Sequence, residues 1–201
     1  MRNSNIKLMT QLALLIAIEA VMKLTGLHNI PLGPINMSLL TIPVAIGAIV
    51  LGPLSGAVLG FVFGALSFMD AITGASAMTS TFMTISAINT FILCVVMRTL
   101  MGWCVGLIYA ALKKVMKSNV RYFIAAACAP LLNTLFFMGY IVIAFYNTDY
   151  IQALCTSLGA TNPLIFVALL VGMQGLIEAC GGCIIGGITS KAVDVVVNRN
   201  K

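Results

Sequence analysis

The chain has 201 residues, of which 61% are hydrophobic and only 8% are charged, and its mean hydropathy is +1.09. This composition is too apolar for a soluble domain of this length and predicts an integral membrane protein. It excludes a nucleotide-binding domain or a hydrophilic enzyme module. The net charge is +6, but the basic residues are not interleaved with aromatic residues as on a nucleic-acid-binding surface, so no nucleic-acid partner is expected.

Six apolar runs predict membrane-crossing helices, since a helix needs about 20 apolar residues to cross a hydrocarbon core of about 30 Å. We expect one all-α transmembrane domain over residues 1–201, with helices at about 8–25, 37–52, 53–69, 80–112, 121–146 and 163–194. Gly52-Pro53 is expected to separate the second helix from the third; the alternative is a single kinked helix. The fourth run exceeds the thickness of a bilayer, which predicts a tilt or a projection into the cytoplasm.

The basic residues predict the orientation, because Lys and Arg accumulate on the cytoplasmic side of a membrane. They lie before the first helix, between the fourth and fifth helices, and after the sixth: Arg2, Lys7, Lys113, Lys114, Lys117, Arg121, Lys191, Arg199 and Lys201. With six helices these segments share one face, so we expect a multi-pass plasma-membrane protein with both termini in the cytoplasm. Segments 26–36, 70–79 and 147–162 are then outer loops, rich in Gly, Pro, Asn, Thr and Ser.

Polar residues inside the apolar runs are the candidate functional residues. A charged side chain near the middle of a bilayer costs about 2.5–3.5 kcal/mol, so it normally faces a bundle interior and has a partner. Gln174 and Glu178 share one face of the sixth helix, and Asn133 and Tyr140 share one face of the fifth. With Asn89 and Arg98 on the fourth helix, these groups would form an apolar pocket with a few polar contacts if their faces converge. The alternative is that they only hold the helices together, at about 0.6 kcal/mol for each hydrogen bond.

Two helices carry stripes of small residues that allow another helix to approach closely. The third helix has three glycines at intervals of four residues, Gly56, Gly60 and Gly64, which predict internal packing. Ala13 and Ala17 form a shorter stripe on the first helix, which serves either internal packing or docking on another membrane protein. Near the outer end of that helix, Glu19 and Lys23 stand in the favoured i to i+4 order and are expected to neutralise each other.

The cysteines and the single histidine give no pattern typical of a metal site or a catalytic site. Cys180 and Cys183 form a C-x-x-C motif past the middle of the sixth helix, where we interpret the cysteines as small apolar packing residues. His28 lies in an outer loop, so no histidine cluster is available for a metal. We predict no enzyme activity, no metal and no cofactor; a membrane thiol oxidoreductase is the alternative.

Several segments resemble one transporter family. The segment IPLGPINMSLLTIPVAIGAIVLGPLSGAVLGFVFGALSF, residues 30–68, resembles the second and third helices of the substrate-binding S components of energy-coupling factor (ECF) vitamin transporters. LNTLFFMGYIVIAF in the fifth helix and QGLIEACGGCIIGGI in the sixth are similar to the same family. Ala13-x-x-x-Ala17 matches the small-residue motif by which S components dock on a coupling subunit, although Val21 stands where the pattern can continue with a third alanine.

The resemblance implies an S-component-like bundle that captures a small water-soluble vitamin outside the cell, docks on a transmembrane coupling subunit with two ATPase subunits, and releases the vitamin inside. It implies a substrate-binding set of Asn36, Asn89, Arg98, Asn133, Tyr140, Gln174 and Glu178, with Asn36 and segment 70–79 as a lid and Ala13 and Ala17 as docking residues. The pantothenate branch is the most similar. Riboflavin, folate or pyridoxine, a membrane scaffold without a ligand, and a gradient-driven transporter stay open as alternatives.

Overall fold

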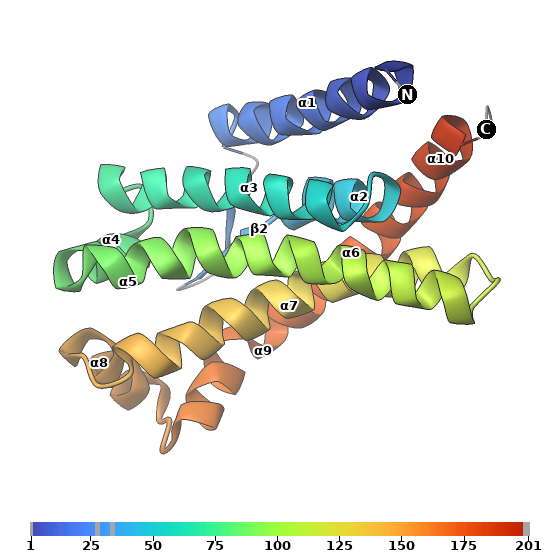
Figure 1. Cartoon of the computed structure of the whole chain (residues 1–201). Coiled ribbons are helices and arrows are strands. Elements are labelled where there is room, and N and C mark those ends of the chain that lie inside the picture. Colours follow the sequence, from blue (N-terminus) through green and yellow to red (C-terminus); the bar gives the residue numbers. More distant parts are fainter. Residues whose placement is uncertain (1, 27–28, 33–34, 199–201) are drawn as a thin grey trace.

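The computed structural model describes residues 2–26, 29–32 and 35–198, which fold into a bundle of helices with one short β-hairpin (Figure 1). The first half comprises α1 (Arg2–Leu24), β1 (Asn29–Leu32), β2 (Ile35–Ser38), α2 (Thr41–Val50), α3 (Pro53–Thr73), α4 (Ala77–Ile85) and α5 (Ala87–Phe91). The second half comprises the π-helix η1 (Ile92–Val96), α6 (Met97–Val115), α7 (Val120–Phe145), α8 (Asp149–Leu158), α9 (Pro163–Gly181), the π-helix η2 (Gly182–Gly186) and α10 (Gly187–Asn198).

The described residues contain five helical segments that are long and apolar enough to cross a membrane: Asn5–Leu24, Pro53–Thr73, Ala87–Val115, Val120–Phe145 and Gly175–Val196. The number is six if α8 and the first half of α9, which are bent by 72° relative to each other, count as one span. This confirms the prediction of an all-helical membrane bundle. The predicted second helix, 37–52, is wrong in its extent, because α2 has only ten residues and reaches about 15 Å at 1.5 Å per residue.

Two of the predicted long helices are interrupted. The predicted helix 80–112 is broken at Ser86, whose extended backbone (φ −158°, ψ 105°) ends α4 and whose hydroxyl accepts a hydrogen bond from the backbone N–H of Asn89 at the start of α5. The predicted helix 163–194 contains η2 and continues to Asn198, and the predicted helix 8–25 begins earlier, at Arg2. π-helical turns such as η1 and η2 are frequent at functional sites.

The three predicted outer loops are more ordered than expected. Segment 26–36 falls largely in the antiparallel hairpin, in which Asn29 is paired with Ser38. Segment 70–79 is helical except at residues 74–76. Segment 147–162 contains α8, because Ile151 and Cys155 are buried one turn apart and give this polar segment one apolar face.

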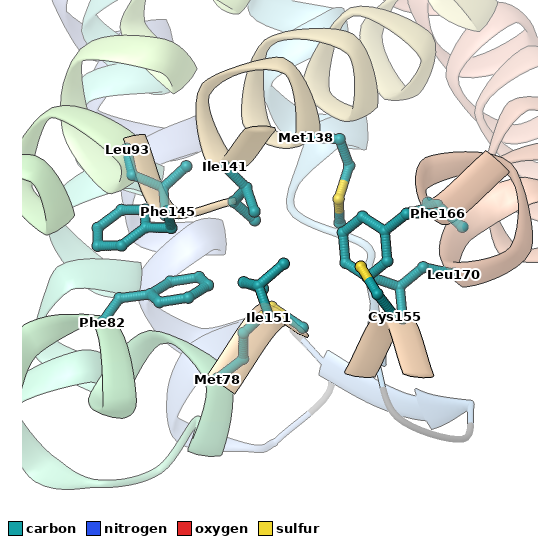
Figure 2. Packing of buried hydrophobic residues seen from close by; sticks show 11 residues of the cluster. Met78, Phe82, Leu93, Met138, Ile141, Phe145, Ile151, Cys155, Phe166 and Leu170 are labelled. Atoms are coloured by element: carbon teal, nitrogen blue, oxygen red, sulfur yellow. The ribbon is translucent and has the colours of Figure 1, made fainter. Parts of the chain in front are cut away.

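The bundle has its termini toward one end and α4 and α8 toward the other (Figure 1). Around α4, α7, α8 and α9, buried apolar side chains form a cluster in which the Phe82 and Phe145 rings stack with their centroids 4.2 Å apart (Figure 2). A second cluster joins α2, α3 and α6 and includes Leu59 and Phe63. The connection between α6 and α7 lies at the same end of the bundle as the termini (Figure 1). The orientation predicted from the basic residues requires this, because it places the connection and both termini on the cytoplasmic side.

The α3–α6 contact confirms that the glycine stripe serves internal packing. A methyl group at Gly56 would collide with the Gly102 carbonyl oxygen, and one at Gly60 would collide with the Arg98 carbonyl oxygen. At Gly64, a methyl carbon would lie 2.6 Å from the Cys94 carbonyl oxygen. These three glycines therefore bring the backbone of α3 directly against the part of α6 and η1 that carries Arg98.

Candidate functional site

Arg98 is a buried cation in the first turn of α6, with 7% of its surface exposed. Its guanidinium carbon lies 4.5 Å from the Phe63 ring centroid and 4.7 Å from that of Phe137, so aromatic rings from α3 and α7 hold it by cation–π contacts. Its Nη1 donates a hydrogen bond to the Cys94 carbonyl oxygen at 3.2 Å. Its Nε finds no hydrogen-bond partner among the described residues. The guanidinium therefore keeps donor capacity for an anionic group.

Glu178 and Asp70 are the carboxylates whose charges act on Arg98. Glu178 is buried in α9, and its Oε1 accepts a hydrogen bond of 2.8 Å from the backbone N–H of Ser38, the last residue of the hairpin. Hydrogen bonds to a charged acceptor are about twice as strong as neutral ones. Glu178 thus fastens the hairpin to α9 while lying within the electrostatic field of Arg98.

The predicted polar face of α7 is turned toward Arg98 of α6. Asn133, Phe137 and Tyr140 are spaced by four and three residues, so they share one face of the helix. Phe137 contacts the Arg98 guanidinium, which places this face toward α6. The Tyr140 hydroxyl donates to Asn89 Oδ1 at 3.2 Å, and the buried Asn133 Oδ1 has no hydrogen-bond partner in the described part of the chain. The structure thus brings four of the predicted polar residues to one region: Asn89, Arg98, Asn133 and Tyr140.

Two predicted site residues have side chains that lie outside the described residues. Asn36 belongs by its backbone to β2, where it is paired with Pro31. Gln174 belongs to α9, one helical turn before Glu178. Their predicted part in substrate binding stays a prediction. The predicted lid residue Asn36 is connected to the candidate site by the backbone of the hairpin, whose last residue, Ser38, donates a hydrogen bond to Glu178.

One ion pair beside the site was not expected from the sequence. Lys23 at the end of α1 pairs with Asp70, which is buried near the end of α3. The expected Glu19–Lys23 pair is wrong as stated, because both carboxylate oxygens of Glu19 lack a hydrogen-bond partner in the described residues. Asp70 was assigned to a loop because Gly, Ser and Thr residues follow it. Its place at the end of an apolar run was the available signal for a buried charge.

The predicted docking stripe lies on the outside of the bundle. Ala13 and Ala17 are both exposed on α1, the helix at the edge of the bundle beside α3 (Figure 1). Only 6% of the most apolar part of α1 is buried, against 22–44% for the other four candidate spans. Internal packing therefore does not account for these two alanines.

A family model described as "ECF transporter, substrate-specific component" matches residues 7–186. The chain belongs to this family. The match covers the region from the second turn of α1 to the end of η2 and thus includes Arg98, Glu178 and the polar face of α7. No curated protein matches the chain. As an ECF substrate-specific component, the protein is a multi-pass subunit of a plasma-membrane transporter rather than an enzyme, and the family implies a small-molecule substrate and partner subunits.

Proposed function

We propose that this S component binds a small water-soluble vitamin at the Arg98 site, with pantothenate as the best candidate, and delivers it through a coupling subunit energised by two ATPase subunits. The observation that carries the proposal is the buried Arg98 guanidinium, whose Nε has no hydrogen-bond partner among the described residues. A buried charge is costly unless it is paired. A substrate carboxylate would give the guanidinium the bidentate partner that it prefers.

The surrounding groups suit the rest of a pantothenate molecule, which carries two hydroxyls and an amide. Asn133 Oδ1 is a buried acceptor that finds no partner in the part of the chain that the structure describes, and Tyr140 and Asn89 form a hydrogen-bonded pair at partial burial. Such groups can exchange hydrogen bonds with hydroxyls and an amide N–H. Glu178 does not exclude an anionic substrate, because one of its oxygens already accepts from the Ser38 N–H. It acts in this proposal as the anchor of the hairpin beside the substrate.

A thermal-shift screen of the purified protein against B vitamins and their precursors tests the substrate. A ligand that binds only the folded state stabilises it by RT ln(1 + [L]/Kd), which is about 2.7 kcal/mol at 100-fold excess over Kd. We expect one large shift, with pantothenate. A shift with riboflavin, folate or pyridoxine instead would identify that vitamin, and not pantothenate, as the substrate. If none of these compounds shifts the melting temperature of a folded sample, a scaffold without a ligand is favoured.

The exposed Ala13/Ala17 face of α1 is proposed to dock on the coupling subunit, since small residues let two helices approach closely. The variant Ala17→Trp should abolish copurification with the coupling module and leave vitamin binding intact. Leu135→Trp, on an exposed position of α7, is the matched control and should retain copurification. Equal loss of copurification in both variants would show that any bulky residue on the membrane face disturbs the complex.

A further inference from the structure

Glu19 is a fully buried ionisable side chain on α1. It has 0% exposure and lies toward the outer end of the candidate membrane span Asn5–Leu24, yet neither carboxylate oxygen has a hydrogen-bond partner in the described part of the chain. An ionisable group inside a membrane is costly and is by default a functional residue with an identifiable partner. The natural partner by sequence is Lys23, one turn later on the same helix. In this structure, however, Lys23 pairs with Asp70 of α3.

One lysine therefore stands between two carboxylates. Residues four apart on a helix have Cβ atoms about 5–6 Å apart, so the flexible Lys23 side chain can reach Glu19 by changing its rotamers alone. Glu19 is buried on α1 between Leu15 and Met22, which pack against the cluster containing Leu59 and Phe63. Pairing with Asp70 ties α1 to α3, whereas pairing with Glu19 keeps both charges within α1.

α1 is also the least buried of the five candidate spans in the described residues. Only 6% of its most apolar part is buried, and its outer face carries the exposed Ala13 and Ala17. A displacement of α1 from α3 would break the Lys23–Asp70 pair, so Lys23 would lose this counter-charge at the outer end of the span. Glu19 removes that cost, because it moves together with Lys23.

We propose that Lys23 exchanges between Asp70 and Glu19, and that this exchange lets α1 shift relative to α3 when the helix docks on a partner. The charge of Asp70 also acts on Arg98. Once Lys23 has left, its positive charge no longer offsets that of Asp70, and the negative charge of Asp70 weakens the binding of an anionic substrate at Arg98 in the docked state. The link to substrate release rests on the proposed function, whereas the exchange itself does not.

A double-mutant cycle on the full-length protein tests the exchange. The variants Glu19→Gln, Asp70→Asn and the double variant are compared by equilibrium unfolding in mixed micelles, in the wild-type background and in a Lys23→Gln background. If Lys23 exchanges between the two carboxylates, Asp70→Asn causes little loss of stability, because Lys23 pairs with Glu19 instead. The double variant then reduces the folding equilibrium constant at least about tenfold more than the product of the two single effects. Lys23→Gln abolishes this coupling.

The opposite pattern overturns the proposal. If Lys23 serves Asp70 alone, Asp70→Asn carries the whole loss, and adding Glu19→Gln causes no further loss. Failure of either single variant to fold also counts against exchange, since each leaves Lys23 with one carboxylate.

Pantothenate binding gives a separate readout. Asp70→Asn should bind pantothenate more tightly than the wild type, because one negative charge that acts on Arg98 is removed. If the wild type binds no pantothenate, the proposed substrate fails while the unfolding cycle still decides the exchange. Unchanged or weaker binding by the variant, with a binding-competent wild type, contradicts the link between Asp70 and the substrate.

Discussion

Gly60→Ala is expected to destabilise the protein through the α3–α6 contact. An added methyl group would collide with the Arg98 carbonyl oxygen and would lie 3.1 Å from the Cα of Thr99, whereas ordinary contacts lie at 3.4–4 Å. Backbone atoms cannot move aside as a flexible side chain can, so the two helices must separate. Overpacking of this kind costs about 1–3 kcal/mol. The displaced backbone is that of Arg98 itself, so substrate binding should weaken as well.

The matched control for this prediction is Gly139→Ala. Gly139 lies on α7, and a methyl group there meets no atom within 4 Å. Replacing a helical glycine with alanine without a clash is neutral or stabilises by up to about 1 kcal/mol. Thermal unfolding of the purified variants measures the difference, which should be at least about 1 kcal/mol in favour of Gly139→Ala. Equal stability of the two variants would refute the tight α3–α6 packing on which the position of Arg98 depends.

Three further predictions concern other parts of the bundle. Phe82→Ala should lower the free energy of unfolding by about 3–5 kcal/mol, because Phe82 is fully buried and stacked in the cluster that joins α4 to α7 and α8; denaturant unfolding measures this loss. Glu178→Gln should weaken the hydrogen bond to the Ser38 N–H and raise the rate of amide hydrogen exchange at Ser38. The rate of exchange in α7 should stay unchanged. Replacing both Cys180 and Cys183 with Ala should leave vitamin binding unchanged, since both are free thiols and neither is buried; loss of binding would reopen the thiol interpretation.

Apolar periodicity and glycine spacing were sufficient to predict the membrane class and the close internal packing of α3, although not that its partner is α6. Both depend on local properties of one segment, namely the length of an apolar run and the stripe formed by Gly56, Gly60 and Gly64. The common face of Asn133, Phe137 and Tyr140 also follows from helical spacing alone. That this face lies toward Arg98 required the structure, because it depends on how α6 and α7 are rotated against each other.

The sequence misled where tertiary contacts overrode the local pattern of residues. Segment 147–162 has the composition of a loop, but Ile151 and Cys155 pack against α7 and α9 and make it helical. Lys23 was expected to pair within its own helix, whereas Asp70, 47 residues away, is its partner. Helical spacing predicts which pairs are possible, and tertiary packing decides which of the possible pairs forms.

The most direct test of the proposed site compares pantothenate with its alcohol analogue pantothenol, which lacks the carboxylate, on the wild type and on Arg98→Gln. Isothermal titration would give the four affinities. Loss of one partner from a buried charged pair costs about 2–5 kcal/mol, so the wild type should bind pantothenate at least about 30-fold more tightly than pantothenol. Arg98→Gln should bind the two ligands with similar, weak affinity. If the variant, still folded, keeps the wild-type preference for pantothenate, Arg98 does not bind the carboxylate and the account of the site is wrong.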